Sequence, residues 1–184
     1  MSAGAAKALT SSRLQSHFEL FGLARAFHLD SAVLDKAYRE IQSEVHPDRF
    51  AHGGDAERRA SLQWTTRVNE AYRTLKNPVQ RAKHILELQG VDVAFETNTQ
   101  MPTEFLMRQL ELREALEGAA AKRDPGALDA LRAELAVSRK GLESQIGEAL
   151  DARKDYAGAA ELVRKLMFLE RLDQEVDAAY EELE

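Results

Sequence analysis

The sequence predicts an all-α protein, and three observations carry that prediction. Only 10 Gly and 4 Pro occur among 184 residues, so long segments can remain helical without interruption. Apolar residues recur at intervals of three, four and seven positions along most of the chain, which is the period of an amphipathic helix. We find no convincing strand pattern. The expected architecture is an N-terminal helical hairpin with short flanking helices, followed by an antiparallel three-helix bundle.

The first helical unit is expected over residues 17–90, after a flexible tail over 1–16. The tail is small, polar and rich in Ser and Ala, as loose termini are. Ser31 is expected to cap a helix that Pro47 stops, because proline disfavours α geometry at the residue before it. The apolar face of this helix comprises Leu34, Ala37, Tyr38, Ile41 and Val45.

Two more helices complete the first unit. Asp55 is expected to cap the longer one. Asn77 is expected to be the N-cap of the shorter helix and Pro78 to be in its first turn. Gly90 is expected to end this helix. The apolar face of the longer helix is expected to contain Leu62, Val68, Ala71, Tyr72 and Leu75.

Residues 91–101 lack helical periodicity and are expected to form a linker to a bundle over 102–184. Pro102 is expected just inside the start of the first bundle helix, with a turn over 124–126 and a second break at 154–155. Short turns favour antiparallel neighbours. The second helix repeats Leu128, Leu131, Leu135, Leu142, Ile146 and Ala149, and the third repeats Leu162, Leu166, Leu169, Leu172, Val176, Tyr180 and Leu183.

Composition excludes several classes of function. A net charge of -6 disfavours a nucleic-acid binder, which needs a basic face. The absence of cysteine excludes disulfides, a thiolate nucleophile and cysteine ligation of zinc or an iron–sulfur cluster. No apolar run is long enough to cross a membrane. Residues 1–95 carry 13 basic and 11 acidic side chains, whereas 96–184 carry 12 and 20, so the two halves are expected to face different partners.

The loop at His46-Pro47-Asp48 is the first candidate site. Pro47 makes the loop rigid, so an imidazole and a carboxylate are presented to a partner at low entropic cost. On local chemistry alone, two other interpretations stay open. His46 and Asp48 serve as helix-end caps in one, and they form a metal site with His52 and Asp55 in the other. The sequence contains no pair of catalytic acid–base groups and no phosphate-binding glycine motif.

The second candidate site lies on the helix that starts near Pro102. Leu106, Met107 and Leu110 fall outside the core face of this helix and share a side with Glu111 and Glu114. The predicted core face consists of Phe105, Leu112, Ala115, Leu116 and Ala119, and on the last helix Met167 and Phe168 lie off or at the edge of the leucine face. Such residues indicate either a partner-binding surface or packing against the first unit or a second copy.

Three segments in order resemble a J domain. They are Leu34 to Glu40, Val45 to Phe50, which holds the His-Pro-Asp tripeptide, and Val68 to Leu75. The resemblance implies that the loop binds a heat-shock-protein-70 class chaperone and accelerates its ATP hydrolysis, so that this chain has no catalytic residues of its own. The implied chaperone-binding residues are His46, Pro47, Asp48, Lys36, Arg39 and Arg49. The helix before the loop is less basic than is usual in J domains, because it contains Glu40, Ser43 and Glu44 beside its two basic residues. This lower positive charge suggests that the partner is a dedicated chaperone.

The second half resembles the HscB family of iron–sulfur cluster assembly co-chaperones. The matching segments are Phe105 to Glu114 and Val163 to Leu169, with Phe21-Gly22-Leu23 and Pro78 to Ala82 in the first unit. The family implies an IscU-type scaffold protein and an HscA-type chaperone as partners, with no cofactor and no bound metal. The implied scaffold-binding residues are Leu106, Met107, Leu110, Glu111, Glu114 and Phe168. The short N-terminus favours the bacterial cytoplasm over the mitochondrial matrix.

Overall fold

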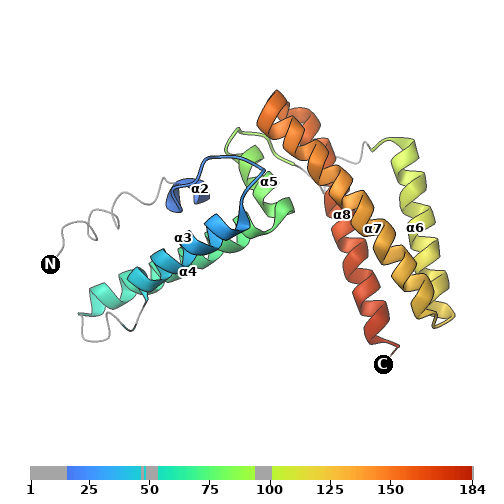
Figure 1. Cartoon of the computed structure of the whole chain (residues 1–184), viewed down its shortest axis with the longest axis horizontal. Coiled ribbons are helices and arrows are strands. Elements are labelled where there is room, and N and C mark those ends of the chain that lie inside the picture. Colours follow the sequence, from blue (N-terminus) through green and yellow to red (C-terminus); the bar gives the residue numbers. More distant parts are fainter. Residues whose placement is uncertain (1–15, 47, 49–53, 94–100, 184) are drawn as a thin grey trace. The chain divides into compact units, whose positions relative to one another are not determined.

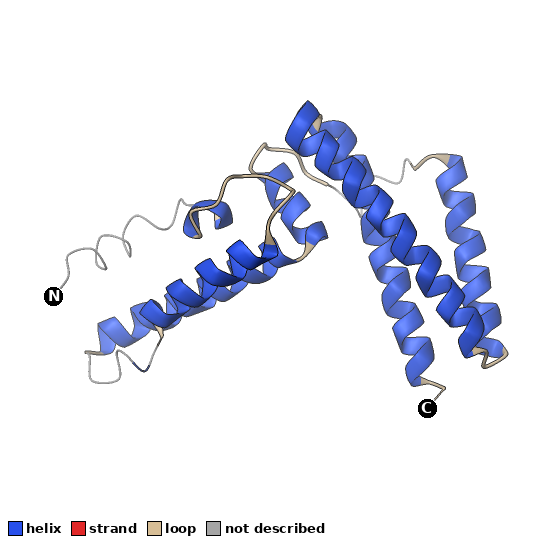
Figure 2. Ribbon diagram, viewed as in Figure 1, coloured by secondary structure: helices blue, strands red, loops and turns tan. Residues whose placement is uncertain are grey.

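The computed structural model describes residues 16–46, 48, 54–93 and 101–183 (Figure 1). These residues form helices, turns and loops without a strand, which confirms the all-α prediction (Figure 2). The chain divides into two compact units, 1–89 and 90–184. The linker predicted over 91–101 stays a prediction, because 94–100 lie outside the described residues. None of the described helices combines the length and the apolar character needed to cross a bilayer.

The N-terminal unit is built on the antiparallel pair α3 (Ser31–Val45) and α4 (Asp55–Lys76) (Figure 1). The short helix α2 (His17–Leu20) and α5 (Pro78–Glu87) both pack against α4. The tripeptide region connects α3 to α4 and so lies at one end of the hairpin. The buried apolar side chains of this unit are Phe18, Phe21, Phe27, Leu34, Val68, Ala71, Leu75, Val79, Ala82, Ile85 and Leu86.

Helix starts in this unit follow capping chemistry, with the predicted caps displaced by one residue at two places. Asp30, not Ser31, caps α3, since its Oδ1 accepts the Ala32 amide at 2.8 Å. Gly54, not Asp55, is the cap position of α4. Asn77 caps α5 as predicted, with Oδ1 accepting from the Gln80 amide at 2.9 Å and Pro78 as the first helical residue.

Ser16, which the sequence analysis assigned to the tail, is the buried cap of α2. Its hydroxyl accepts the Glu19 amide at 3.3 Å, and Glu19 Oε2 accepts the Ser16 amide at 2.8 Å. This reciprocal pair is a capping box, which satisfies two amides that a four-residue helix would leave open.

The predicted core face of α4 was wrong at Leu62. Val68, Ala71 and Leu75 are buried as expected, but Leu62 is exposed and Ser61 takes the buried position. Along a helix of about 100° per residue, Ser61 lies near the direction of Val68 and Leu75, and Leu62 lies roughly 100° from Ser61. A serine is tolerated there because its hydroxyl donates to the Val45 carbonyl at 2.7 Å.

The C-terminal unit is a bundle of α6 (Thr103–Ala121), α7 (Pro125–Gly147) and α8 (Tyr156–Glu181), which run in alternating directions (Figure 1). A π-helical segment, η3 (Glu148–Arg153), extends α7 and packs on both α7 and α8. Two starts differ from prediction by a residue or more. Pro102 precedes α6 as its cap position, and the segment expected as a turn over 124–126 is the cap Asp124 followed by the first residues of α7.

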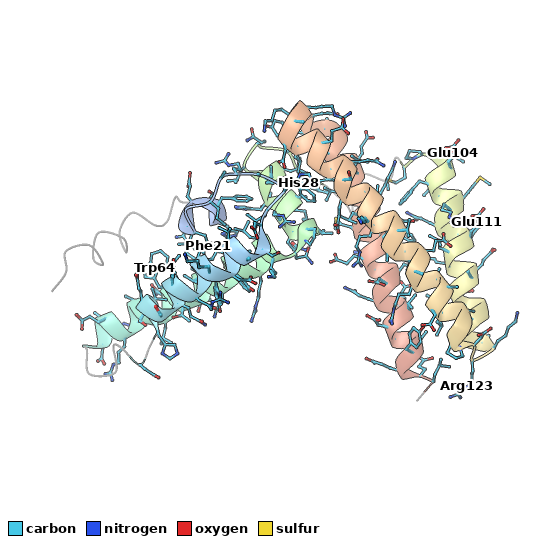
Figure 3. All side chains as sticks on the ribbon, viewed as in Figure 1. Phe21, His28, Trp64, Glu104, Glu111 and Arg123 are labelled. Carbon is cyan, nitrogen blue, oxygen red and sulfur yellow. The ribbon has the colours of Figure 1, made fainter. Side chains whose placement is uncertain are left out.

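The chain reverses between α6 and α7 at Arg123, which adopts a left-handed φ of 51°. The guanidinium of Arg123 donates to the carbonyls of Glu182 and Leu183, both at 3.2 Å. The turn is therefore tied to the end of α8, where Figure 3 labels Arg123. This contact holds one end of α6 in place.

The bundle core is supplied unequally by its helices. α8 buries ten residues, α7 five and α6 only Leu112, Leu116 and Ala119. Ala115, predicted in the core, is exposed, because it lies roughly 60° around α6 from Leu112 and roughly 100° from Leu116, at the edge of the core face. α7 packs closely on α8, while α6 borders mainly α7. A large part of the surface of α6 therefore faces solvent.

The α2 helix is held by an imidazole pair. The His17 amide donates to His84 Nε2 at 3.2 Å, and the two rings stack at 4.1 Å between centroids. Burial lowers the pKa of His84 to about 4, and the positive charges of His17 and Arg25 act in the same direction. Burial also lowers the pKa of His17. The folded unit thus favours the neutral form of both rings.

We expect acid to destabilise the protein through this pair. The folded pKa of His84 lies below the ordinary value, so its contribution is complete above about pH 6.5 and is lost as pH falls toward 4. Because the ring keeps some contact with water, we expect the loss to be about 1 kcal/mol between pH 7 and pH 5. Urea unfolding of the parent and of His84→Gln at pH 7 and pH 5 measures this loss of unfolding free energy.

His84→Gln retains an acceptor but does not titrate, so its free energy of unfolding should vary less with pH. The exposed His28 offers the matched control, since His28→Gln should keep the pH dependence of the parent. Equal pH slopes in the parent and in His84→Gln would contradict the assignment.

Candidate partner-binding sites

The C-terminal end of α3 is anchored to α4 directly before the tripeptide. The Val45 carbonyl accepts the hydroxyl of Ser61 at 2.7 Å and that of Thr65 at 3.3 Å. The last carbonyls of a helix have no partner within the helix, so these two hydroxyls satisfy a group that would otherwise face solvent. His46 follows at once, and its backbone position is therefore set by α4.

His46 and Asp48 contact one another and remain accessible. The Asp48 amide donates to His46 Nδ1 at 3.3 Å, and Nδ1 lies 3.6 Å from Asp48 Oδ2. The side chains are 50% and 92% exposed, respectively. With Nδ1 acting as acceptor, the neutral ring carries its proton on Nε2, which gives the loop one donor beside one carboxylate.

This contact bears on the two open interpretations of the loop. The amide-to-imidazole hydrogen bond is a local cap of the kind considered above, and it leaves both side chains available to a partner. For the metal site, His52 lies outside the described residues, as do Pro47 and Arg49. Among the residues that are described, no three His, Asp or Glu side chains are grouped to hold a metal ion.

The two basic residues predicted on α3 are exposed. Lys36 forms a 3.9 Å ion pair with Glu40, one turn further on, and Arg39 is also exposed. A surface pair of this kind is weak and exchanges readily for another carboxylate. The structure therefore presents Lys36 and Arg39 on the helix that leads into the loop.

A polar network that sequence reasoning missed aligns α3 with α4. The Tyr38 and Tyr72 rings stack at 4.1 Å, and the Tyr38 hydroxyl donates to Asn69 Oδ1 at 2.8 Å. Tyr72 and Lys76 both donate to Asp35 Oδ1, at 2.9 and 2.6 Å. Hydrogen bonds from Lys76 and Tyr72 lower the pKa of Asp35, and the same carboxylate raises the pKa of Lys76. The periodic pattern showed the tyrosines only as apolar positions.

The second candidate site is the outer face of α6. Leu106, Met107 and Leu110 are 46%, 61% and 59% exposed. At about 100° per residue, these three and the exposed Glu111 and Glu114 span roughly 140° of the helix circumference. The buried face, with Leu112 and Leu116, points the other way. We call the five exposed residues the α6 face; Figure 3 labels Glu111 on it.

One acid of the α6 face already has a partner. Arg108 donates to Glu111 Oε2 at 2.6 Å and also contacts Glu134 of α7. The hydrogen bond with Glu111 and the charge of Glu134 raise the pKa of Arg108. This network connects the α6 face to α7 and limits the motion of Glu111.

Phe168, which the family resemblance implies as a scaffold-binding residue, lies on α8 inside the bundle and not among the exposed residues of the α6 face. Its part in scaffold binding stays a prediction. The Phe168 side chain is only 6% exposed and belongs to the bundle core with Leu169 and Leu172. Its ring meets Phe105 edge-on at 5.8 Å, and the Arg113 guanidinium lies 5.8 Å from its centroid. α8 is covered on several sides, so a residue at the edge of its leucine face is buried. Phe168 therefore supports α6 from inside the bundle.

The family model for the HSCB C-terminal oligomerisation domain matches residues 101–177. Curated co-chaperone protein HscB homologues from Burkholderia vietnamiensis and Burkholderia multivorans are each 54% identical over 169 residues. Those alignments cover 92% of this chain and 96% of each relative.

Solved structures agree with these sequence matches. Chaperone HscB from Vibrio cholerae is 36% identical, with a TM-score of 0.81 over 92% of this chain and 100% of that one. The human co-chaperone protein HscB is 26% identical, with a TM-score of 0.86 over 91% of this chain and 83% of that one. The fold, the anchored loop and the near-complete match to curated relatives agree, and the chain belongs to the HscB family of co-chaperones.

Proposed function

We propose that this chain is an adaptor in iron–sulfur cluster assembly. Its C-terminal unit binds an IscU-type scaffold protein, and its N-terminal unit docks an HscA-type chaperone and stimulates the ATPase of that chaperone. The observation that carries the proposal is the α6 face, where three large apolar side chains lie in water while their helix has a complete core face on its other side.

The α6 face has the composition of a binding hot spot. Leu106, Met107 and Leu110 provide adjacent apolar surface, and Glu111 and Glu114 border it with carboxylates. An apolar centre bordered by a polar rim is the usual arrangement of a protein interface. The acidic balance of residues 96–184, with 12 basic and 20 acidic side chains, favours a scaffold surface with basic groups.

The loop after α3 suits a chaperone contact. The Asp48 carboxylate is almost fully exposed and can accept two parallel hydrogen bonds from an arginine of the partner. His46 adds a donor beside it, and Lys36 and Arg39 supply positive charge on the adjoining helix. We assign Pro47 and Arg49 to the same contact on the family resemblance alone. The hydrolysis itself takes place in the ATP site of the chaperone.

The adaptor role needs two sites built from different residues. The loop belongs to the unit over 1–89 and the α6 face to the unit over 90–184, and we propose that the two partners are bound at the same time. Joining scaffold and chaperone through one chain raises their effective concentration and makes their encounter intramolecular. Since the curated relatives come from bacteria, we place this activity in the bacterial cytoplasm.

His46→Gln is expected to abolish stimulation of the chaperone ATPase and to leave scaffold binding unchanged. The substitution removes the imidazole from an exposed loop and disturbs no core contact. Steady-state ATP hydrolysis by the chaperone, with and without the co-chaperone, measures the first effect, and calorimetry with scaffold measures the second. His28→Gln, at another exposed histidine of the same unit, should retain full stimulation. Normal stimulation by His46→Gln would overturn the loop assignment.

Leu106→Ala and Leu110→Ala are each expected to raise the Kd for the scaffold about tenfold, as hot-spot truncations do. Their exposure means that the free energy of unfolding should hardly change. Val137 on α7 is 75% exposed, so Val137→Ala is a matched control that should bind scaffold normally. Calorimetric titrations of the three variants decide the matter, and equal affinities in all three would remove the α6 face from the proposal.

Phe168→Ala is expected to act through stability. Emptying this core position should cost about 3 kcal/mol of the free energy of unfolding. Weaker scaffold binding should accompany it, because Phe105 loses its edge-on partner beneath α6. Chemical denaturation separates this variant from Leu106→Ala. An unfolding free energy equal to that of the parent would show that Phe168 lies at the surface.

A further inference from the structure

The α6 face holds the most exposed methionine of the described residues. Met107 is 61% exposed, whereas Met101 and Met167 are half-buried. Reaction of a thioether with an oxidant in water depends on access to the sulfur. Met107 is therefore the methionine of the described chain that an oxidant in solution reaches first.

Met107 contributes to the surface of the bundle and not to its core. The core of α6 is formed by Leu112, Leu116 and Ala119, with Phe105 packed against it. A chemical change at the Met107 sulfur leaves these contacts in place. Its consequences are confined to the binding of a partner at the α6 face, on which Met107 neighbours Leu110.

The charges around Met107 determine whether charged or neutral oxidants approach its sulfur. Glu104 stands three residues before it and Glu111 four residues after it, so both carboxylates lie on the same side of the helix, and Figure 3 labels both on α6. Residues 96–184 carry 12 basic and 20 acidic side chains. Arg108 pairs with Glu111, so Glu104 and the acidic balance of this half repel an anionic oxidant, whereas a neutral oxidant is not repelled.

We propose that Met107 is a reversible oxidation site through which hydrogen peroxide weakens scaffold binding. The sulfur attacks one peroxide oxygen and the O–O bond breaks. One oxygen is transferred to sulfur, which loses two electrons, and water leaves with both peroxide protons. The product, methionine sulfoxide, is strongly polar. Methionine sulfoxide reductases return it to the thioether, so the change is reversible.

The effect on binding follows from desolvation. A thioether adapts to an apolar partner surface, while a sulfoxide oxygen loses its water there without gaining a donor. We expect the Kd for the scaffold to rise about tenfold on oxidation of Met107. This inference rests on the proposed function, because it needs the α6 face to be the scaffold-binding surface.

The test treats the full chain with hydrogen peroxide and follows each methionine by peptide mass spectrometry. Met107 should gain oxygen faster than Met101 and Met167, and saturating scaffold should protect it. Calorimetry before and after treatment should show the weaker binding, with an unchanged thermal unfolding curve. Treatment with the two sulfoxide reductases, one for each sulfoxide epimer, should restore the initial Kd.

Two variants separate the effect of oxidation at Met107 from oxidation at the other methionines. Met107→Leu cannot be oxidised at this position, so its own Kd should be the same before and after peroxide. The double variant Met101→Leu, Met167→Leu should respond to peroxide as the parent does. A peroxide response that persists in Met107→Leu, an unchanged Kd in oxidised parent, or oxidation of Met107 no faster than that of Met167 would each overturn the inference. Failure of the untreated parent to bind scaffold would instead refute the proposed function.

Discussion

The C-terminal unit depends on one constraint: a helix buries only as much of its circumference as its neighbours cover. α8 is bordered by α6, α7 and η3, and it buries ten residues, including Phe168. α6 borders mainly α7 and buries three. Burying a Leu or Phe side chain is worth about 1.5–3 kcal/mol, so the exposed apolar residues on α6 contribute none of this stabilisation to the isolated protein. The stabilisation becomes available only when another molecule covers the face, and for this reason we infer a partner for the α6 face.

The chaperone-binding site proposed in the N-terminal unit likewise depends on contacts with a neighbouring helix. Between α3 and α4 the structure describes His46, Asp48 and Gly54, and none of the three is buried. The start of this segment is held where hydroxyls of α4 donate to the Val45 carbonyl. The register of α3 against α4 is in turn set by the Tyr38–Tyr72 stack and by the Asp35 carboxylate. A contact loop anchored at its base keeps its exposed groups in position at little entropic cost on binding. The polar network between α3 and α4 thus positions the end of α3, although none of the network residues is assigned to the chaperone contact.

The two units also differ in electrostatic character, with 13 basic and 11 acidic side chains in residues 1–95 and 12 and 20 in 96–184. Surface charge steers association and excludes wrong partners more than it adds affinity. Two sites of different charge and different chemistry, one a polar loop and one an apolar face, suit different ligands. Membership of the HscB family and this division of surfaces support the same adaptor role.

The helices, the tripeptide loop and the off-core position of Leu106, Met107 and Leu110 could be predicted from the amino-acid sequence, because helical period and turn chemistry are local properties. Which of the remaining apolar residues reach water depends on tertiary packing. Phe168 lies at the edge of the leucine face of α8 and Leu106 lies off the core face of α6, yet α8 is covered and α6 is not, so Phe168 is buried and Leu106 is exposed. On α4 the helical phase already places Ser61, and not the expected Leu62, near Val68 and Leu75. The tertiary structure adds the Val45 carbonyl of α3, which accepts the buried serine hydroxyl. Whether a side chain is buried depends on which elements pack against it. Elements that are distant in sequence cannot be identified from the local pattern of apolar residues.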